Sequence, residues 1–240
     1  MQPALRLDLR RAGALHQIRL ARHGAFGGSH FNELLSRADL ALADKIIQLV
    51  DQVRLGILGR VPTAVAVELA GVKVEDSVTI NGARLQLNGA GIRYKGPFKV
   101  YVGDLYTTRR VSSLDDLIAA PGPKRLSMTF LRDINSAEFG KLLTRGMEDN
   151  VSKQELSKII PGMIKMGDIF AANKSFAPGD VCSLEWDPAK GLSVYAKGKL
   201  QAEPFKDPAF YRALMSIWFG NTPADWKLKD ELLGVKPQPQ

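Results

Sequence analysis

From residue 67 onward, short runs of the chain alternate apolar and polar residues at every second position, which is the pattern of half-buried β-strands. We expect strands at 67–74, 77–80, 84–87, around Arg93, at 98–107 and at 125–131, and a three-strand meander at 181–186, 192–196 and 199–203. Asn81-Gly82, between two of these runs, favours a tight hairpin turn. The alternation therefore predicts a mainly antiparallel sheet.

Apolar residues spaced by three and four positions predict helices at 113–120, 136–149, 153–172, 207–219 and 225–233. Pro161-Gly162 is expected to kink or split the longest of them. Strands followed by helices, a meander and closing helices indicate an α+β domain with its helices on one face of an antiparallel sheet. An earlier amphipathic stretch, 31–58, predicts a helix that packs on this domain or a protein partner, or lies on a membrane surface.

Arg93 is the residue that the strand pattern makes conspicuous. With side chains alternating faces, it falls in phase with Leu85, Leu87 and the two glycines that precede it, on the apolar face of its strand. A guanidinium is permanently charged, so burying it requires an anionic or polar partner. That partner is either an internal acid, such as Asp104 or Glu185, or a ligand.

The amino-acid composition excludes several classes of function and of site. The net charge is +8, but residues 1–30 carry five arginines against Asp8, so half of the excess lies in that leader and no basic footprint for nucleic acid remains. All three histidines lie in the leader as well, which leaves the main domain without a histidine base and excludes the usual serine- and cysteine-hydrolase sites. The single Cys182 excludes an intrachain disulfide, and we expect neither a metal site nor a cofactor.

Several blocks of sequence are recognisable. The stretch Asn88-Gly89-Ala90-Gly91-Ile92-Arg93, followed by residues 98–106, resembles the paired strands of the chalcone isomerase superfamily. Residues 130–134 with the helix after them, and residues 213–220, resemble later blocks in the same order. The likeness spans roughly 67–234 and is greatest to the bacterial chalcone-isomerase-like branch.

The resemblance implies an open-faced β-sandwich, a large antiparallel sheet covered by helices, with an apolar cleft between them. In the plant enzymes, the arginine matched by Arg93 polarises the substrate while a chalcone phenolate adds across its enone. In the fatty-acid-binding branch, the matching arginine grips a carboxylate. Tyr101 stands where the enzymes carry a threonine, Phe139 stands at their cleft tyrosine, and Leu142 and Gly146 replace a lysine and an asparagine.

We therefore expect a chalcone-isomerase-like protein that holds a small amphipathic anion, fatty-acid-like or phenolic, in an apolar cleft. Arg93 and Tyr101 are its expected polar anchors, and Phe139, Leu142 and Met163 its expected apolar lining, although core filling is the commoner role of a methionine. The alternative is an active intramolecular lyase in which Arg93 stabilises the enolate of a chalcone or related enone, with Tyr101 as a second catalytic group.

The expected organisation is an N-terminal extension (1–66), the chalcone isomerase-like domain (67–234) and a short tail (235–240). No transmembrane helix is expected. The extension offers a possible surface for a protein partner or self-association at 31–58. Relatives in the bacterial branch commonly begin with a signal peptide, which implies a periplasmic or secreted protein, but Asp51, Arg54 and Arg60 interrupt every apolar run that could form one here.

Overall fold

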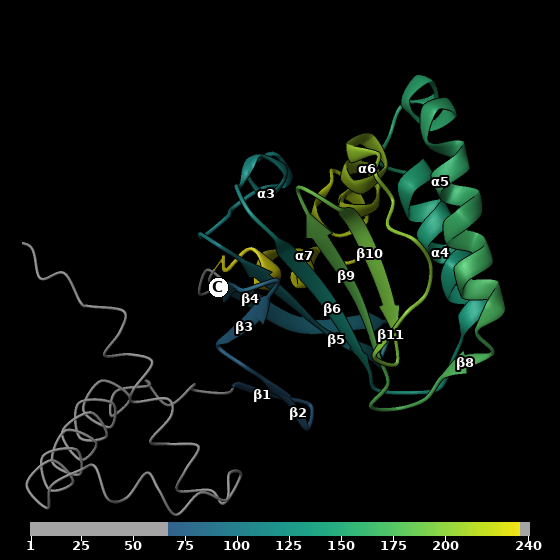
Figure 1. The fold of residues 1–240 in the computed structure, drawn as a ribbon. Helices are drawn as coiled ribbons and strands as arrows, with labels where there is room; N and C mark the ends of the chain where they lie inside the picture. The colour runs from purple at the N-terminus through teal and green to yellow at the C-terminus, as the bar shows by residue number, and fades with distance from the viewer. Residues whose placement is uncertain (1–66, 236–240) are drawn as a thin grey trace, which may run out of the picture. The chain divides into compact units, whose positions relative to one another are not determined.

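The computed structural model describes residues 67–235. Its central element is a seven-stranded sheet in the order β11–β10–β9–β6–β5–β4–β3, in which every neighbouring pair is antiparallel (Figure 1). The strands are β3 (Ser77–Ile80), β4 (Ala83–Lys95), β5 (Phe98–Thr107), β6 (Lys124–Phe130), β9 (Val181–Asp187), β10 (Gly191–Ala196) and β11 (Lys199–Leu200). Two small antiparallel sheets pair β1 (Val67–Leu69) with β2 (Val72–Val74) and β7 (Ile134–Asn135) with β8 (Ser175–Phe176).

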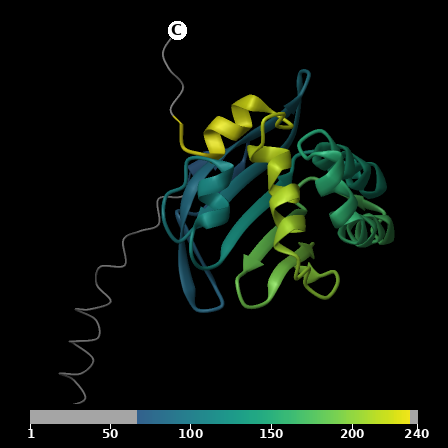
Figure 2. The same cartoon turned by 90° about the horizontal axis from the view of Figure 1, so that it is seen from above.

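The helices of the described region are α3 (Leu114–Ala119), α4 (Ser136–Glu148), α5 (Lys153–Ala172), α6 (Pro208–Phe219) and α7 (Trp226–Leu232). A polar side chain caps the first turn of each by accepting a backbone N–H: Ser113, Asn135, Ser152, Asp207 and Asp225. In the view from above, the helices lie around one side of the sheet (Figure 2). The α+β open-faced fold expected from the sequence is therefore confirmed.

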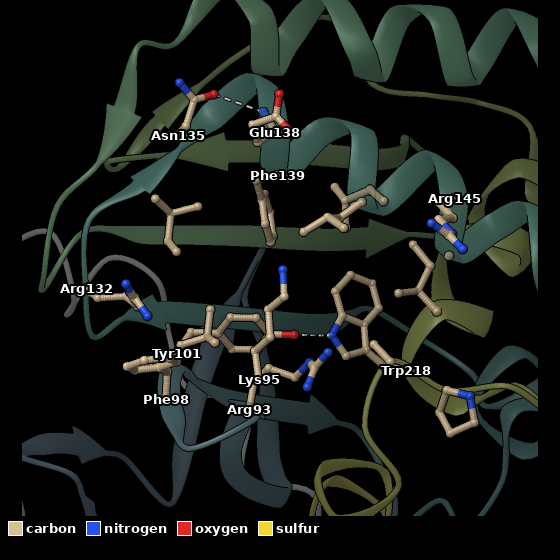
Figure 3. Close-up of a pocket in the computed structure, with 18 of the residues that line it drawn as sticks. Arg93, Lys95, Phe98, Tyr101, Arg132, Asn135, Glu138, Phe139, Arg145 and Trp218 are labelled. Carbon is tan, nitrogen blue, oxygen red and sulfur yellow. Dashed lines mark hydrogen bonds between the residues drawn. The ribbon is translucent and has the colours of Figure 1, made fainter.

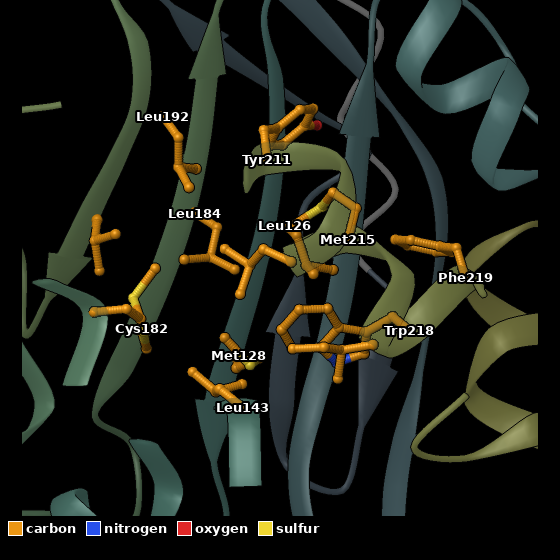
Figure 4. Packing of buried hydrophobic residues seen from close by; sticks show 14 of the residues in the cluster. Leu126, Met128, Leu143, Cys182, Leu184, Leu192, Tyr211, Met215, Trp218 and Phe219 are labelled. Atoms are coloured by element: carbon orange, nitrogen blue, oxygen red, sulfur yellow. The ribbon is translucent and has the colours of Figure 1, made fainter. Parts of the chain in front are cut away.

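The main core lies between the sheet and the helices. Helix α6 is at its centre, because nine of its twelve residues are buried and it presents apolar side chains in every direction. Leu126 and Met128 of β6, and Cys182 and Leu184 of β9, meet this helix from the sheet (Figure 4). The predicted strand at 125–131 is thus confirmed as β6, and its apolar face provides the floor on which the helices rest.

Helix α5 differs from its prediction. The sequence predicts a kink or a break at Pro161-Gly162, and the break is wrong, because the helix runs unbroken over this pair. Gly162 lies against the ring of Phe210 on α6, so closely that a Cβ atom there would overlap the ring. Tertiary packing therefore holds the segment helical despite the missing hydrogen bond of the proline.

The sequence placed Arg93 on the same face of β4 as Leu85 and Leu87, and that placement is wrong. A β-bulge at Asn88 shifts the register of β4 against β5 between Leu87 and Gly89, and a bulge inverts which side chains face the core. Leu85 and Leu87 consequently pack in a second apolar cluster on the outer face of the sheet, beneath the β1–β2 hairpin. Arg93 pairs with Tyr101 and faces the helices.

Asn88 itself accounts for the bulge. It is buried, and its side chain donates to the carbonyl oxygens of Val111 (3.0 Å) and Leu232 (2.8 Å) while accepting from the Val111 N–H (2.8 Å). These three hydrogen bonds satisfy a polar side chain that would otherwise be costly to bury. The bulge therefore ties β4 both to the segment after β5 and to α7.

The outer face also carries a polar row beside the apolar cluster. Asp104, Ser127, Ser183 and Tyr195 are successive register partners across four strands, and the first three are buried. Burial raises the pKa of Asp104 from 3.8 to about 6, against the opposing hydrogen bond from Ser127 and the charge of Arg125. The folded protein therefore holds a proton on Asp104 more tightly than the unfolded chain does.

Stability should consequently fall as the pH rises from about 4 to about 6 and stay lower above that range. We expect Asp104→Asn, which mimics the protonated acid, to remove this slope and to raise stability at pH 8 by up to about 3 kcal/mol. Thermal denaturation at pH 4.5 and pH 8 measures both effects, with Asp230→Asn, at an exposed position, as the matched control. Equal behaviour of the two variants would contradict the prediction.

Candidate functional site

A cavity of about 500 Å³ opens between the sheet and α4. Its floor is the hairpin end of β4 and β5, its wall is α4, and its far side is the end of α6 with the loop that leads to α7 (Figure 3). Much of this lining is apolar or aromatic, contributed by Phe98, Val100, Tyr101, Ile134, Phe139, Leu142, Leu143, Ile217, Trp218 and Pro223. Such a cavity suits a small apolar or amphipathic molecule.

Arg93 reaches the cavity from β4, and its partner is an acid that the sequence did not suggest. Its Nη1 lies 3.3 Å from the Oδ2 atom of Asp225 and also donates to the carbonyl oxygen of Tyr94. The sequence suggested Asp104 or Glu185 as the partner. Asp104 lies on the opposite face of the sheet from Arg93, and Glu185 lies 3.6 Å from Arg125. Among the described residues, no hydrogen bond uses Nε or Nη2 of Arg93. The guanidinium therefore keeps two adjacent donors for a ligand.

Asp225 holds this arrangement together from the start of α7. One carboxylate oxygen caps the helix by accepting from Leu228 N (3.2 Å), and the other accepts from Tyr94 N (3.0 Å) as well as from Arg93. Nearly two turns later, Glu231 accepts from Ile92 N (3.2 Å). Two acids of α7 thus satisfy backbone donors along β4 and position Arg93 from its strand.

Gly89 and Gly91 allow α7 to approach so closely. A Cβ atom at Gly89 would overlap the carbonyl oxygen of Glu231, and a Cβ atom at Gly91 would overlap the side chain of the same residue. The Gly-x-Gly pattern that precedes Arg93 is therefore a contact surface for α7 within a strand.

Tyr101 stands beside Arg93 and is fully buried. Its phenol oxygen accepts a hydrogen bond from the indole Nε1 of Trp218 at 2.9 Å (Figure 3). Because an indole can only donate, the hydroxyl hydrogen of Tyr101 is directed elsewhere, and none of the described residues accepts it. Burial raises the pKa of Tyr101 to about 12, so the phenol stays a neutral donor at ordinary pH.

The wall formed by α4 has no polar group of its own facing the cavity at the positions matched to the plant enzymes. Phe139 is buried, and its ring meets Phe130 and Phe170 edge to face at centroid distances of 5.3 and 5.4 Å. Leu142 lines the cavity while remaining 54% exposed, and Gly146 follows one turn later. These three positions can pack against a ligand but offer it no side-chain hydrogen bond, and the polar groups that α4 brings to the cavity are Glu138 and Arg145.

The structure thus brings four of the five expected site residues to one cavity. Met163 is the exception, since it lies partly buried against the main core and outside the cavity lining. Trp218 and Asp225 were missed by sequence reasoning, because each acts through a partner more than 100 residues away in the chain. Asp225 before a helix is recognisable as a cap, but nothing in the sequence links it to Arg93.

Two negative findings concern the described residues only. Within 67–235, no group of three or more histidine, cysteine, aspartate or glutamate side chains is arranged to hold a metal ion. In the same part of the chain, no helix has the length and apolar character needed to cross a membrane.

A seven-stranded antiparallel sheet covered by helices on one face, with a largely apolar cavity between them, defines an open-faced α+β sandwich. The model of the family described as chalcone isomerase-like matches residues 66–234, and the chain belongs to this family. A search of curated proteins found no match. A similar solved structure is that of an Arabidopsis thaliana fatty-acid binding protein, with 16% sequence identity, a TM-score of 0.55, and coverage of 70% of this chain and 95% of that chain. At this identity the likeness concerns the fold.

Proposed function

We propose that the protein binds a small amphipathic carboxylate, of the fatty-acid type, in the cavity beside α4. The observation that carries the proposal is a set of hydrogen-bond donors at the polar side of the cavity. Nε and Nη2 of Arg93 and the hydroxyl of Tyr101 have no acceptor among the described residues, and they stand next to an apolar lining. A carboxylate accepts from a guanidinium fork and a phenol together, while its chain fills the apolar volume.

The fold of the solved fatty-acid binding protein supports this choice of ligand class. A phenolic anion fits the same donors, and competition between dodecanoate and a flavonoid phenolate in one titration distinguishes the two chemistries. Retention of acyl chains by the purified full-length protein, detected by mass spectrometry after denaturation, is the direct test. Absence of bound acid together with no measurable affinity for dodecanoate would overturn the proposal.

The intramolecular lyase is the less favoured alternative. Arg93 and Tyr101 could stabilise an enolate oxygen, but Phe139 provides no hydroxyl where the plant enzymes have one. We therefore expect turnover of naringenin chalcone to stay at the spontaneous rate. A rate well above it that is lost in Arg93→Ala would establish the alternative instead.

Tyr101→Phe tests the second anchor. Removing the hydroxyl takes one hydrogen bond from the ligand and leaves the buried Nε1 of Trp218 without its acceptor. We expect dodecanoate to bind about tenfold more weakly, measured by isothermal titration. Tyr94→Phe, at a tyrosine outside the cavity lining, serves as the control and should bind as the wild type does.

The assignment of the chain to the bacterial branch and its export to the periplasm stay predictions from the family resemblance, and so does the boundary at residue 66. N-terminal sequencing of the native protein tests both the export and the boundary at residue 66. The expected partner surface at 31–58 also stays a prediction, because it lies outside the described residues.

A further inference from the structure

The mouth of the cavity carries an exposed aromatic ring among cations. Lys95, Phe98 and Lys99 lie at the turn of the β4–β5 hairpin, and Arg132 follows β6; we call these four residues the tip patch. Phe98 is 57% exposed, and the guanidinium carbon of Arg132 lies 4.9 Å from the centre of its ring (Figure 3). Three of the four, Lys95, Phe98 and Arg132, also line the cavity.

The charges of the tip patch are not compensated within the described part of the chain. None of its three cations forms an ion pair there. Of the acids that line the mouth, Glu138 pairs with Lys141 at 2.8 Å and Asp149 lies 3.9 Å from Arg145, which leaves Asp133 alone beside the patch. Three cations against one acid leave an excess of two positive charges around an exposed ring.

We propose that the tip patch docks on the surface of an anionic lipid bilayer, with Phe98 entering the interface and the three cations contacting lipid phosphates. Aromatic rings are favoured at the boundary between head groups and acyl chains. Each basic residue near an anionic surface strengthens binding about fivefold. The patch consists of four residues, far fewer than the roughly 20 on each side that a stable protein–protein interface uses. The inference rests on the proposed function, because a docked mouth would receive an acyl ligand directly from the membrane.

The test uses the full chain without added ligand and measures its cosedimentation with vesicles of phosphatidylcholine alone or with phosphatidylglycerol. The tip variant combines Lys95→Gln, Lys99→Gln and Arg132→Gln. The control combines Lys158→Gln, Lys190→Gln and Lys206→Gln, three exposed lysines outside the tip patch, and has the same net charge. The arginines of residues 1–30 are present in both, so any contribution they make cancels in the comparison.

We expect the tip variant to bind phosphatidylglycerol vesicles at least tenfold more weakly than the control. Phe98→Ser should weaken binding as well, whereas Ile164→Ser, at a 60% exposed position on α5, should not. Equal losses in the tip and control variants, or no binding by the wild type, would overturn the proposal.

Arg93→Ala separates this inference from the proposed function. If the tip patch docks, Arg93→Ala binds vesicles as the wild type does, even where it no longer retains a fatty acid. Parallel loss of vesicle binding and acid binding in this variant would mean that lipid is captured only through the cavity, and it would overturn docking while leaving the proposed function standing.

Discussion

Replacing Arg93 with alanine is expected to weaken the binding of dodecanoate by about 30-fold, roughly 2 kcal/mol. The substitution removes the two donors that have no acceptor among the described residues, and it leaves Asp225, whose side chain is only 12% exposed, without its cation. Both effects act against an entering carboxylate. Arg93→Lys keeps the charge but lacks the planar fork, so we expect an intermediate affinity.

Isothermal titration at fixed pH and salt measures the loss, and thermal denaturation verifies that the variant is folded. Arg212→Ala is the matched control, because Arg212 also pairs with a single aspartate, Asp115 at 2.6 Å, but lies outside the cavity lining. An unchanged affinity in Arg93→Ala would remove Arg93 from the site and with it the proposed anchor.

Replacing Gly89 with alanine is expected to destabilise the domain by roughly 3 kcal/mol. The added methyl group would overlap the carbonyl oxygen of Glu231 and lie 2.6 Å from that of Leu232. These atoms belong to the backbone of α7, so they cannot move aside as a flexible side chain can. The helix would have to shift away from β4, which weakens the hydrogen bonds that Asn88 and Asp225 make across this contact.

Gly167→Ala provides the control in the same protein. Gly167 lies within α5, and nothing lies within 4 Å of a Cβ atom built there, so alanine should stabilise the helix by about 0.5 kcal/mol or more. Denaturant unfolding of both variants measures the difference. Similar stabilities for the two variants would show that α7 does not depend on its approach to β4. If the prediction holds, Gly89→Ala should also weaken ligand binding, because the shift of α7 carries Asp225 away from Arg93.

Local patterns predicted the elements well, because local physics determines them. The helix at 136–149 begins at a polar cap and shows its apolar residues at a period of 3.6, so Phe139 and Leu142 could be assigned to its apolar face from the sequence alone. Both residues line the cavity. Arg93 was also identified correctly as unusual, since a guanidinium in an apolar strand requires a partner.

The alternation used to place Arg93 on a face of its strand is interrupted at Asn88. Strict alternation placed Arg93 on the face of Leu85 and Leu87, whereas the bulge puts those two leucines on the outer face. A buried asparagine within an apolar strand, directly before a glycine, is a signal for such an interruption. Its hydrogen-bond partners at Val111 and Leu232 are far away in the chain, so the register shift could not be derived from the strand alone.

The sequence by itself determined most of the segments that become strands and helices, which family the chain resembles, and that one arginine needs an anion. Only the tertiary structure decided which anion comes from the protein and which donors remain for a ligand. Asp225 reaches Arg93, and Trp218 reaches Tyr101, across more than 100 residues of chain. Such contacts depend on how closely α6 and α7 pack on the sheet, and that packing follows from the shapes of buried side chains at many positions together.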